Sequence, residues 1–377
     1  MIDIERYREE FPVTKHGVFL NHAGVSPICK RAVVEIERWV KENEEAVCAR
    51  YEIWARRVEE VRAKAAKFLN ASPEEIGFVK NTSHGLNHVA QGLGWCEGDN
   101  IVSYNKEFPA NIYPWMNLSS KGVELRLIGD RDGKIHIEDI EDAVDSRTKV
   151  IALSSVEFTT GYRNDLSAIS KLCKSKDIFF CVDAIQSLGA LRMDVKEFGI
   201  DFLSADAHKW LMGPEGIGIF YIRRELLEIC RPAYVGWHSV VEPLKFLPYR
   251  FTLKDNASCF EEGSHNLAGI FALGGCLDLI EEVGINKIER RIIELTDFLV
   301  AELVKKNYNI ISPRGNGEKS GIVSFSVKES AADVVRELAE KNIFISARDG
   351  ALRVSPHFYN TKEEIEILLW GIAKMTK

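Results

Sequence analysis

The chain has 377 residues, of which 46% are hydrophobic and 28% are charged, and its formal net charge is −7. This length and composition predict a globular protein with a large core and two domains. The negative charge argues against a general nucleic-acid-binding or anionic-membrane-binding surface.

The first predicted element is a helical stretch over residues 31–69, where apolar residues recur at helical spacing among alternating charges. The pattern then changes to short β-rich runs, most of them separated by helical or turn-rich stretches. Such alternation predicts an α/β fold with a mixed, mostly parallel sheet covered on both faces. The seven predicted strands are Ile76–Lys80, Ile101–Tyr104, Val123–Ile128, Val150–Ser154, Ile178–Asp183, Phe202–Ala205 and Gly218–Ile222.

The second half departs from this alternation. Residues 231–263 are rich in aromatic residues and proline, which predicts a long ordered loop, and residues 267–307 are predicted to be helical. We expect a large α/β domain over residues 17–278 and a small α+β domain made of residues 1–16 and 279–377. The elements predicted after the helical region are strands 309–311 and 321–327, helix 331–341, strands 343–346 and 352–355, and helix 362–375.

The N-terminal segment MIDIERYREEF is charged, and no apolar run is long enough to cross a bilayer. We therefore expect no signal peptide, no membrane partner and a cytoplasmic location. The eight cysteines include no CxxC pair and no nearby histidine with zinc-ligand spacing. This predicts reduced thiols and no metal site.

The most informative motif is DFLSADAHKW, residues 201–210, in which a lysine follows the end of a strand. Lys209 and Asp183, which ends the neighbouring predicted strand, would meet in the crevice where α/β sheets bind ligands. A lysine there can form a Schiff base with an aldehyde cofactor, and a carboxylate can keep a pyridine nitrogen protonated. From residue type and position alone, a surface lysine and a turn or capping aspartate remain the alternatives.

A second motif, IGFVKNTSHGLNHVA over residues 76–90, predicts a strand, a polar turn and a helix. Asn81, Thr82 and Ser83 would place capping side chains and free N–H groups at the helix N-terminus, which attracts anions such as a phosphate. An ordinary capped helix is the alternative. Because no GxGxxG or GxxxxGK[ST] motif occurs, we expect no dinucleotide or P-loop site.

Together these motifs resemble those of the class V aminotransferases, the pyridoxal phosphate (PLP) enzymes that include serine aminotransferases, cysteine desulfurases and isopenicillin N epimerase. The resemblance extends from FLNHAG at residues 19–24 to SPHFYNT at residues 355–361. It implies the fold-type I architecture of PLP-dependent aminotransferases and pyridoxal 5′-phosphate as the cofactor. An amino acid and a 2-oxo acid are the implied small-molecule partners, and a homodimer is the implied assembly.

The resemblance also implies roles for individual residues. Lys209 would hold PLP as an imine, Asp183 would bind the pyridine nitrogen, and Arg353 would grip the substrate carboxylate with its planar fork. Asn21 and His22 lie in a segment that approaches the substrate in this family, with a helix-capping turn as the alternative. The other implied cofactor contacts are Thr82, Ser83 and His208 at the phosphate, Phe108 stacked on the ring, Ser155 and Gln186 near the ring hydroxyl, Ser264 at the phosphate from the second subunit, and Trp237 in a loop approaching the same site.

The departures from the family pattern limit which reactions of the family this protein could catalyse. Phe108 stands where many desulfurases have histidine, and the segment ISARDGALRVS, residues 345–355, lacks the cysteine that desulfurases carry there. Asp206 stands where many relatives have serine, and we assign it no role. The sequence therefore predicts an aminotransferase in which Lys209 moves the Cα proton.

Three alternatives stay open. An amino-acid epimerase or racemase is the first, and a cysteine desulfurase or lyase is the second. The third is a catalytically silent relative that binds PLP, which is disfavoured because Lys209, Asp183 and Arg353 are all present.

Overall fold

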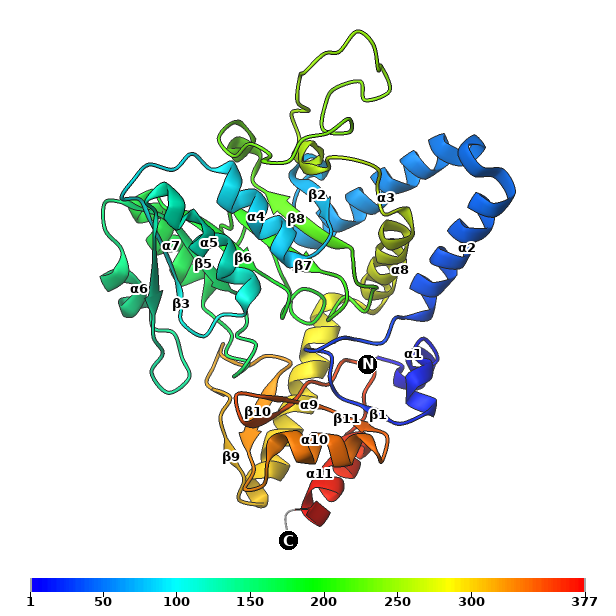
Figure 1. Ribbon diagram of the computed structural model, residues 1–377. Coiled ribbons are helices and arrows are strands. Elements are labelled where there is room, and N and C mark those ends of the chain that lie inside the picture. Colours follow the sequence, from blue (N-terminus) through cyan, green and yellow to red (C-terminus); the bar gives the residue numbers. More distant parts are fainter. Residues whose placement is uncertain (1, 376–377) are drawn as a thin grey trace.

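The computed structural model describes residues 2–375 (Figure 1). Residues 1, 376 and 377, which belong to the predicted small domain, lie outside the described part, as does the side chain of Cys48, one of the eight predicted thiols. Figure 1 shows a larger part with the main sheet above a smaller part that contains α10 (Ala331–Ala339) and α11 (Lys362–Met375). No helix within residues 2–375 combines the length and apolarity of a membrane span.

Seven strands form the main sheet, in the spatial order β2-β8-β7-β6-β5-β3-β4. β8 is antiparallel to both of its neighbours, whereas β7, β6, β5, β3 and β4 run parallel. The predicted mixed, mostly parallel sheet is therefore confirmed. Its strands are β2 (Ile76–Val79), β3 (Asn100–Tyr104), β4 (Glu124–Ile128), β5 (Thr148–Ser154), β6 (Phe179–Asp183), β7 (Phe202–Asp206) and β8 (Gly218–Ile222).

Helices cover both faces of this sheet, because alternate residues of the central strands enter two different cores. Val182 packs into the core shared with α3, α7 and α8, whereas its neighbour Cys181 packs into the core shared with α4 and α5. Burial on both faces explains why these strands are continuous apolar runs rather than alternating ones. The covering helices are α3 (Tyr51–Leu69), α4 (Thr82–Gly92), α5 (Tyr113–Met116), α6 (Ile137–Ala143), α7 (Leu166–Lys176) and α8 (Leu267–Val283).

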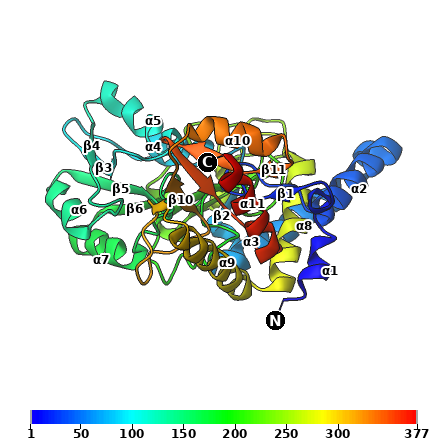
Figure 2. The same cartoon turned by 90° about the horizontal axis from the view of Figure 1, so that it is seen from below.

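Both long predicted helical stretches are interrupted. Residues 31–69 divide into α2 (Lys30–Ala46) and α3 at a 3₁₀ turn over Val47–Arg50. Residues 267–307 divide into α8 and α9 (Ile285–Lys305) at Gly284, whose φ of +87° is a conformation that glycine adopts readily. α2 projects to one side of the body (Figure 2).

The smaller part is built on a four-stranded antiparallel sheet in the order β12-β13-β10-β9. α10 and α11 pack on it, and the N-terminal helix α1 (Ile4–Arg8) joins them through Arg8, whose Nη1 lies 2.9 Å from Glu364 Oε1. The predicted limits of the two domains stay a prediction. The strands are β9 (Asn309–Ile310), β10 (Val323–Ser326), β12 (Ser346–Arg348) and β13 (Ala351–Val354), while β11 (Ile343–Phe344) instead pairs in parallel with β1 (Val18–Phe19).

The predicted long loop over residues 231–263 has no α-helix, and its regular structure is limited to a 3₁₀ turn over Ala257–Phe260 and an isolated bridge between Val240 and Leu253. Figure 1 shows part of this loop standing out from the body. Several of its large apolar side chains are exposed, among them Leu247, Tyr249 and Phe251.

Candidate functional site

A cavity of about 490 Å³ lies where the carboxyl ends of β6 and β7 face β13 of the smaller part. Parallel strands present their carboxyl ends at one edge of a sheet, which is where open α/β sheets bind ligands. The volume is typical of small-molecule sites. The predicted site residues that line this cavity are Asn21, Thr82, Ser83, Phe108, Asp183, Gln186, His208, Lys209 and Arg353.

Asp183 and Lys209 form the buried centre of the cavity. Asp183 Oδ1 accepts a hydrogen bond from the Ile185 N–H at 2.9 Å, while its buried Oδ2 has no partner. Burial raises the pKa of Asp183 to about 6, against the attraction of Lys209. Burial also lowers the pKa of Lys209 to about 8, and Asp183 partly offsets this. The cavity therefore holds an amine that is partly unprotonated near neutral pH and a carboxylate oxygen free to accept a hydrogen bond.

The first turn of α4 borders the same cavity. Asn81 caps this helix by accepting a hydrogen bond from the His84 N–H at 2.9 Å, and Thr82 and Ser83 line the cavity. The first N–H groups of a helix have no partner within it and carry partial positive charge, so they favour a bound anion. The predicted anion-binding turn thus lies at the edge of the cavity that holds Lys209.

Asp206, to which the sequence assigned no role, links this turn to the lysine. Its backbone N–H donates to Thr82 Oγ1 at 3.1 Å, and its Oδ1 lies 2.9 Å from His208 Nδ1. The Asp206 carboxylate thus has a contact within the protein, to the His208 ring. Asp206 therefore connects the start of α4 to the end of β7 and holds the His208–Lys209 segment in place.

Arg353 approaches the cavity from β13. Its Nε donates to Ser346 Oγ at 3.1 Å and its Nη1 to the Phe158 carbonyl at 2.7 Å, while its buried Nη2 has no partner. Burial lowers the pKa of Arg353 to about 9, and the neighbouring Arg348 acts in the same direction. A guanidinium that is fixed at two nitrogens and open at the third is ready to bind an anion.

Phe108 and Phe158 supply an apolar wall. Their rings pack edge to face with centroids 5.3 Å apart, and the centroid of Phe108 lies 5.4 Å from Lys209 Nζ. Phe108 is 43% exposed, so the ring covers Lys209 without being enclosed by protein. This leaves a flat apolar surface available on the cavity side.

Four other predicted residues, from the N-terminal segment and the sheet, differ in whether they reach the cavity. Asn21 lines the cavity and its buried Oδ1 has no partner, whereas His22 is fully buried with its ring nitrogens against the Ser355 carbonyl and the Tyr359 hydroxyl. Gln186 joins the Ala23 carbonyl to the Trp210 indole. Ser155 borders a different hollow together with Ser187, and the two Oγ atoms are 2.6 Å apart. The structure therefore does not bring His22 and Ser155 to the cavity wall.

Trp237 and Ser264 do not line the cavity either, within this single chain. Ser264 borders a smaller hollow between β2 and the 261–266 segment, and Trp237 lies against His238 in the exposed loop. Their predicted contribution to the site of a second subunit stays a prediction.

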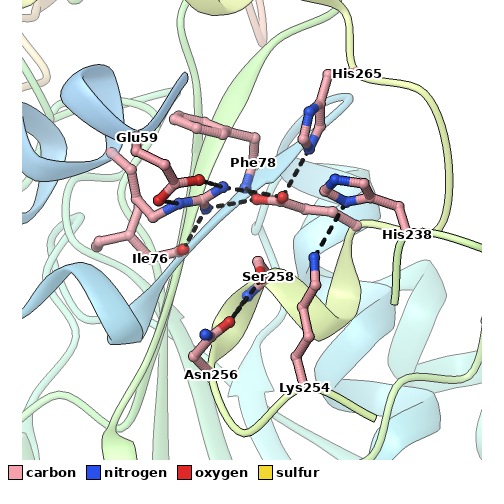
Figure 3. A network of polar contacts seen from close by, with 10 residues as sticks. Glu59, Ile76, Phe78, His238, Lys254, Asn256, Ser258 and His265 are labelled. Carbon is pink, nitrogen blue, oxygen red and sulfur yellow. Dashed lines mark hydrogen bonds and ion pairs between the residues drawn. The ribbon is translucent and has the colours of Figure 1, made fainter. Parts of the chain in front are cut away.

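A buried ionic network holds the base of this loop (Figure 3). Glu261 accepts hydrogen bonds from Arg62 Nη1 at 2.6 Å, Arg62 Nη2 at 3.0 Å and the Phe78 N–H at 2.8 Å, and His265 Nε2 lies 2.8 Å away. His238, Glu261 and His265 bring metal-ligand types within 4.8 Å of one another. Both oxygens of the Glu261 carboxylate already accept hydrogen bonds from the Arg62 guanidinium. Arg62 therefore supplies the positive charge that a metal ion would bring to this cluster.

Two carboxyl groups that the sequence did not single out lie behind Asp183. Glu107 accepts hydrogen bonds from the N–H and hydroxyl of Ser154, which pairs with Asp183 across β5 and β6. Burial raises the pKa of Glu107 to about 8 and raises that of Glu157 well above its usual value. Both groups therefore favour their neutral forms near pH 7, which leaves Asp183 as the more acidic of the three.

Arg348 is a third residue near the cavity that the sequence analysis did not identify. It ends β12, lines the cavity beside Arg353, and precedes a turn in which Asp349 and Gly350 have φ values of 48° and 75°. An Asp-Gly pair between two strand-like runs is a strong hairpin signal, and with that register Arg348 could have been placed on the same face as Arg353.

The structure describes the side chains of seven of the eight cysteines. Among the described ones, Cys96 is exposed, while Cys29, Cys173, Cys181, Cys230, Cys259 and Cys276 are buried. None of these seven lines the cavity.

Comparison with known proteins gives one consistent family. The family model described as Aminotransferase class-V matches residues 18–368. A probable cysteine desulfurase of Methanothermobacter thermautotrophicus is 30% identical, covering 97% of this chain and 96% of that protein. An uncharacterized aminotransferase of Bacillus subtilis, YcbU, is 26% identical over 99% of this chain and 98% of its own length. A solved cysteine desulfurase from Thermococcus onnurineus NA1 is 28% identical and covers 100% of this chain and 98% of its own, with a TM-score of 0.92.

Proposed function

Because the chain belongs to the class V aminotransferase family and has the PLP-dependent fold and cofactor of that family, we propose that it is an aminotransferase in which Lys209 moves the Cα proton of an amino acid. One observation carries the proposal. The buried amine of Lys209 shares a single cavity with an unpartnered oxygen of Asp183 and an unpartnered nitrogen of Arg353.

The residues present fit the cofactor. A buried carboxylate oxygen without a partner suits a pyridine N–H, a capped helix N-terminus suits a phosphate, and an exposed aromatic face suits a flat ring. We therefore assign Asp183 to the ring nitrogen, Thr82 and Ser83 to the phosphate, and Phe108 to the ring face. When bound, PLP withdraws electrons from the substrate and makes its Cα–H bond more acidic.

Side chains of the protein have separate roles in the proton transfer. Arg353 binds the substrate carboxylate through its free Nη2 and so orients the Cα–H bond towards Lys209. The pKa of Lys209, lowered by burial to about 8, leaves part of the amine unprotonated near neutral pH, which allows it to accept the proton. The apolar rings of Phe108 and Phe158 limit the access of water to this proton transfer.

A cysteine desulfurase is the second candidate, since relatives from Methanothermobacter and Thermococcus carry that name. A persulfide-forming reaction needs a nucleophilic thiol at the site, and no described cysteine lines the cavity. The short turn between β12 and β13 also contains no cysteine. These observations favour transamination over sulfur transfer.

A screen of amino acids with the holoenzyme tests the proposal. We expect Cα–H exchange with solvent deuterium by NMR together with formation of a 2-oxo acid. Exchange with loss of optical rotation but without a 2-oxo acid would indicate an epimerase, and sulfide release from cysteine would indicate a desulfurase or lyase; either result would overturn the aminotransferase assignment.

The variant Lys209→Ala should lower the exchange rate by about 10²- to 10⁴-fold, the usual contribution of a general base. Lys15→Ala, which changes an exposed lysine of the N-terminal segment, is the control and should leave the rate unchanged. Undiminished exchange in Lys209→Ala would show that another group moves the proton.

A further inference from the structure

We propose that Arg348 binds the side chain of the substrate, and that the enzyme selects amino acids whose side chain ends in a carboxylate or a similar oxyanion. This inference rests on the proposed function, because it assigns a substrate class to the same cavity. It comes from two features of the β12–β13 hairpin: the face that Arg348 occupies and the absence of an acidic partner.

The hairpin register puts both arginines on one face. Ser346 pairs with Arg353 and Arg348 pairs with Ala351, so Arg348 is two residues along β12 from the partner of Arg353. Because side chains alternate between the faces of a strand, residues at this diagonal position point the same way and lie within reach of long side chains. Both arginines accordingly line the cavity.

Arg348 has no acidic partner. Its Nη1 donates to the Ala347 carbonyl at 2.7 Å, and no carboxylate within residues 2–375 lies within 4.0 Å of its guanidinium. Arg353 is likewise bonded only to a hydroxyl and a carbonyl, with Nη2 free. Two guanidinium groups that face one cavity, neither with a described carboxylate within 4.0 Å, form a site for two negative charges.

The other charged groups of the cavity do not cancel this positive charge. Asp206 is engaged by His208, and Asp183 lies beside Lys209 at the end of β6. The cationic hairpin side therefore remains available to a ligand with two acidic groups.

The two arginines are suited to different ends of such a ligand. Arg353 is almost fully buried and fixed by Ser346 and Phe158, so it suits the carboxylate that every amino acid shares. Arg348 is exposed and lies at the turn of the hairpin, so it suits the distal group of the side chain. An amino-dicarboxylate satisfies both guanidinium groups, whereas a neutral side chain leaves Arg348 without an anion.

The test compares Arg348→Gln with the wild-type holoenzyme. The substrates are L-aspartate and L-glutamate, their neutral counterparts L-asparagine and L-glutamine, and L-cysteine sulfinate, which distinguishes a carboxylate from another oxyanion. We expect Arg348→Gln to lower kcat/KM about 10- to 100-fold for the preferred acidic substrate, mainly through KM, and to change the neutral substrates by less than about twofold. Arg336→Gln is the control, since Arg336 is an exposed arginine of α10 paired with Asp333.

Binding gives a readout that does not require turnover. Calorimetry with the holoenzyme should show succinate binding at least about tenfold more tightly than butyrate, its four-carbon monocarboxylate counterpart, and Arg348→Gln should remove that difference. Equal binding of the two acids, or a wild-type kcat/KM as high for neutral as for acidic amino acids, would overturn the inference. Absence of turnover with every amino acid, together with the expected binding difference, would overturn the proposed reaction but support the role of Arg348.

Discussion

Replacing Glu261 with glutamine tests whether the buried network of Figure 3 stabilises the protein as its geometry predicts. The side chains of Arg62 and Glu261 are only 4% and 2% exposed, and their closest atoms are 2.6 Å apart. Removing one partner of a buried ion pair costs about 3–5 kcal/mol, because the other charge stays buried without compensation. Arg62 keeps Glu59 at 3.0 Å and the Ile76 carbonyl at 2.7 Å, so we expect the lower end, about 3 kcal/mol.

Urea denaturation at pH 7, with coincident fluorescence and circular dichroism transitions, measures this loss in the free energy of unfolding. The control is Glu281→Gln, which removes the exposed ion pair with Lys67 and should cost less than about 1 kcal/mol. If Glu261→Gln costs no more than Glu281→Gln, the network does not stabilise the protein as argued.

The pH dependence of this effect has a definite sign. Burial would raise the pKa of Glu261, but Arg62 and His265 hold it well below its usual value. The stabilisation is therefore complete above the unfolded pKa of about 4.3 and is lost as the pH falls through the lower folded pKa. The contribution of the Glu261 charge to the difference between the wild type and Glu261→Gln should consequently be fully present at both pH 5 and pH 7.

Further predictions concern the pH profile and the backbone beside the site. Lys209, whose pKa burial lowers to about 8, acts as a free, unprotonated amine only after the substrate has replaced it on the cofactor, so kcat, which reports groups of the enzyme–substrate complex, should rise with pH through a step near 8; a flat kcat profile between pH 6 and pH 9 would contradict this role. Gly189 has a φ of +105° and a Cβ there would lie 2.3 Å from the Trp210 carbonyl oxygen, so Gly189→Ala should destabilise the protein by about 1–3 kcal/mol in thermal unfolding. Gly94→Ala, where a Cβ meets nothing within 4 Å, is the matched control, and equal effects of the two substitutions would refute the steric argument.

Most of the main sheet could be predicted because its signals are local. Strands buried on both faces are short apolar runs, and β6, β7 and β8 lie within about one residue of the predicted limits. The interruption of each long helix was missed, because one turn at Val47–Arg50 or one glycine at position 284 changes the helical periodicity very little. The predicted strand 343–346 is divided between β11 and β12 in the structure. This division was missed because it depends on the pairing of β11 with β1, which lies near the opposite end of the chain.

For the candidate site, the sequence by itself placed Asp183 and Lys209 at the ends of neighbouring strands, β6 and β7. Asp183 is the last residue of β6 and Lys209 lies three residues after the end of β7, and neighbouring parallel strands bring such residues to one edge of the sheet. The motif over residues 76–90 added the turn before α4, the family resemblance added Arg353 and Phe108, and the structure collects these residues in one cavity.

Only the tertiary structure decided which way the other side chains point. His22 and Asn21 are adjacent in sequence, yet one is enclosed by Ser355 and Tyr359 while the other lines the cavity. Arg348 joins the site because the register of the β12–β13 hairpin turns it to the same face as Arg353, and a shift of one residue would have turned it away. Residue type and motif are local properties, whereas register, side-chain direction and the absence of a neighbouring carboxylate depend on the packing of segments far apart in the chain.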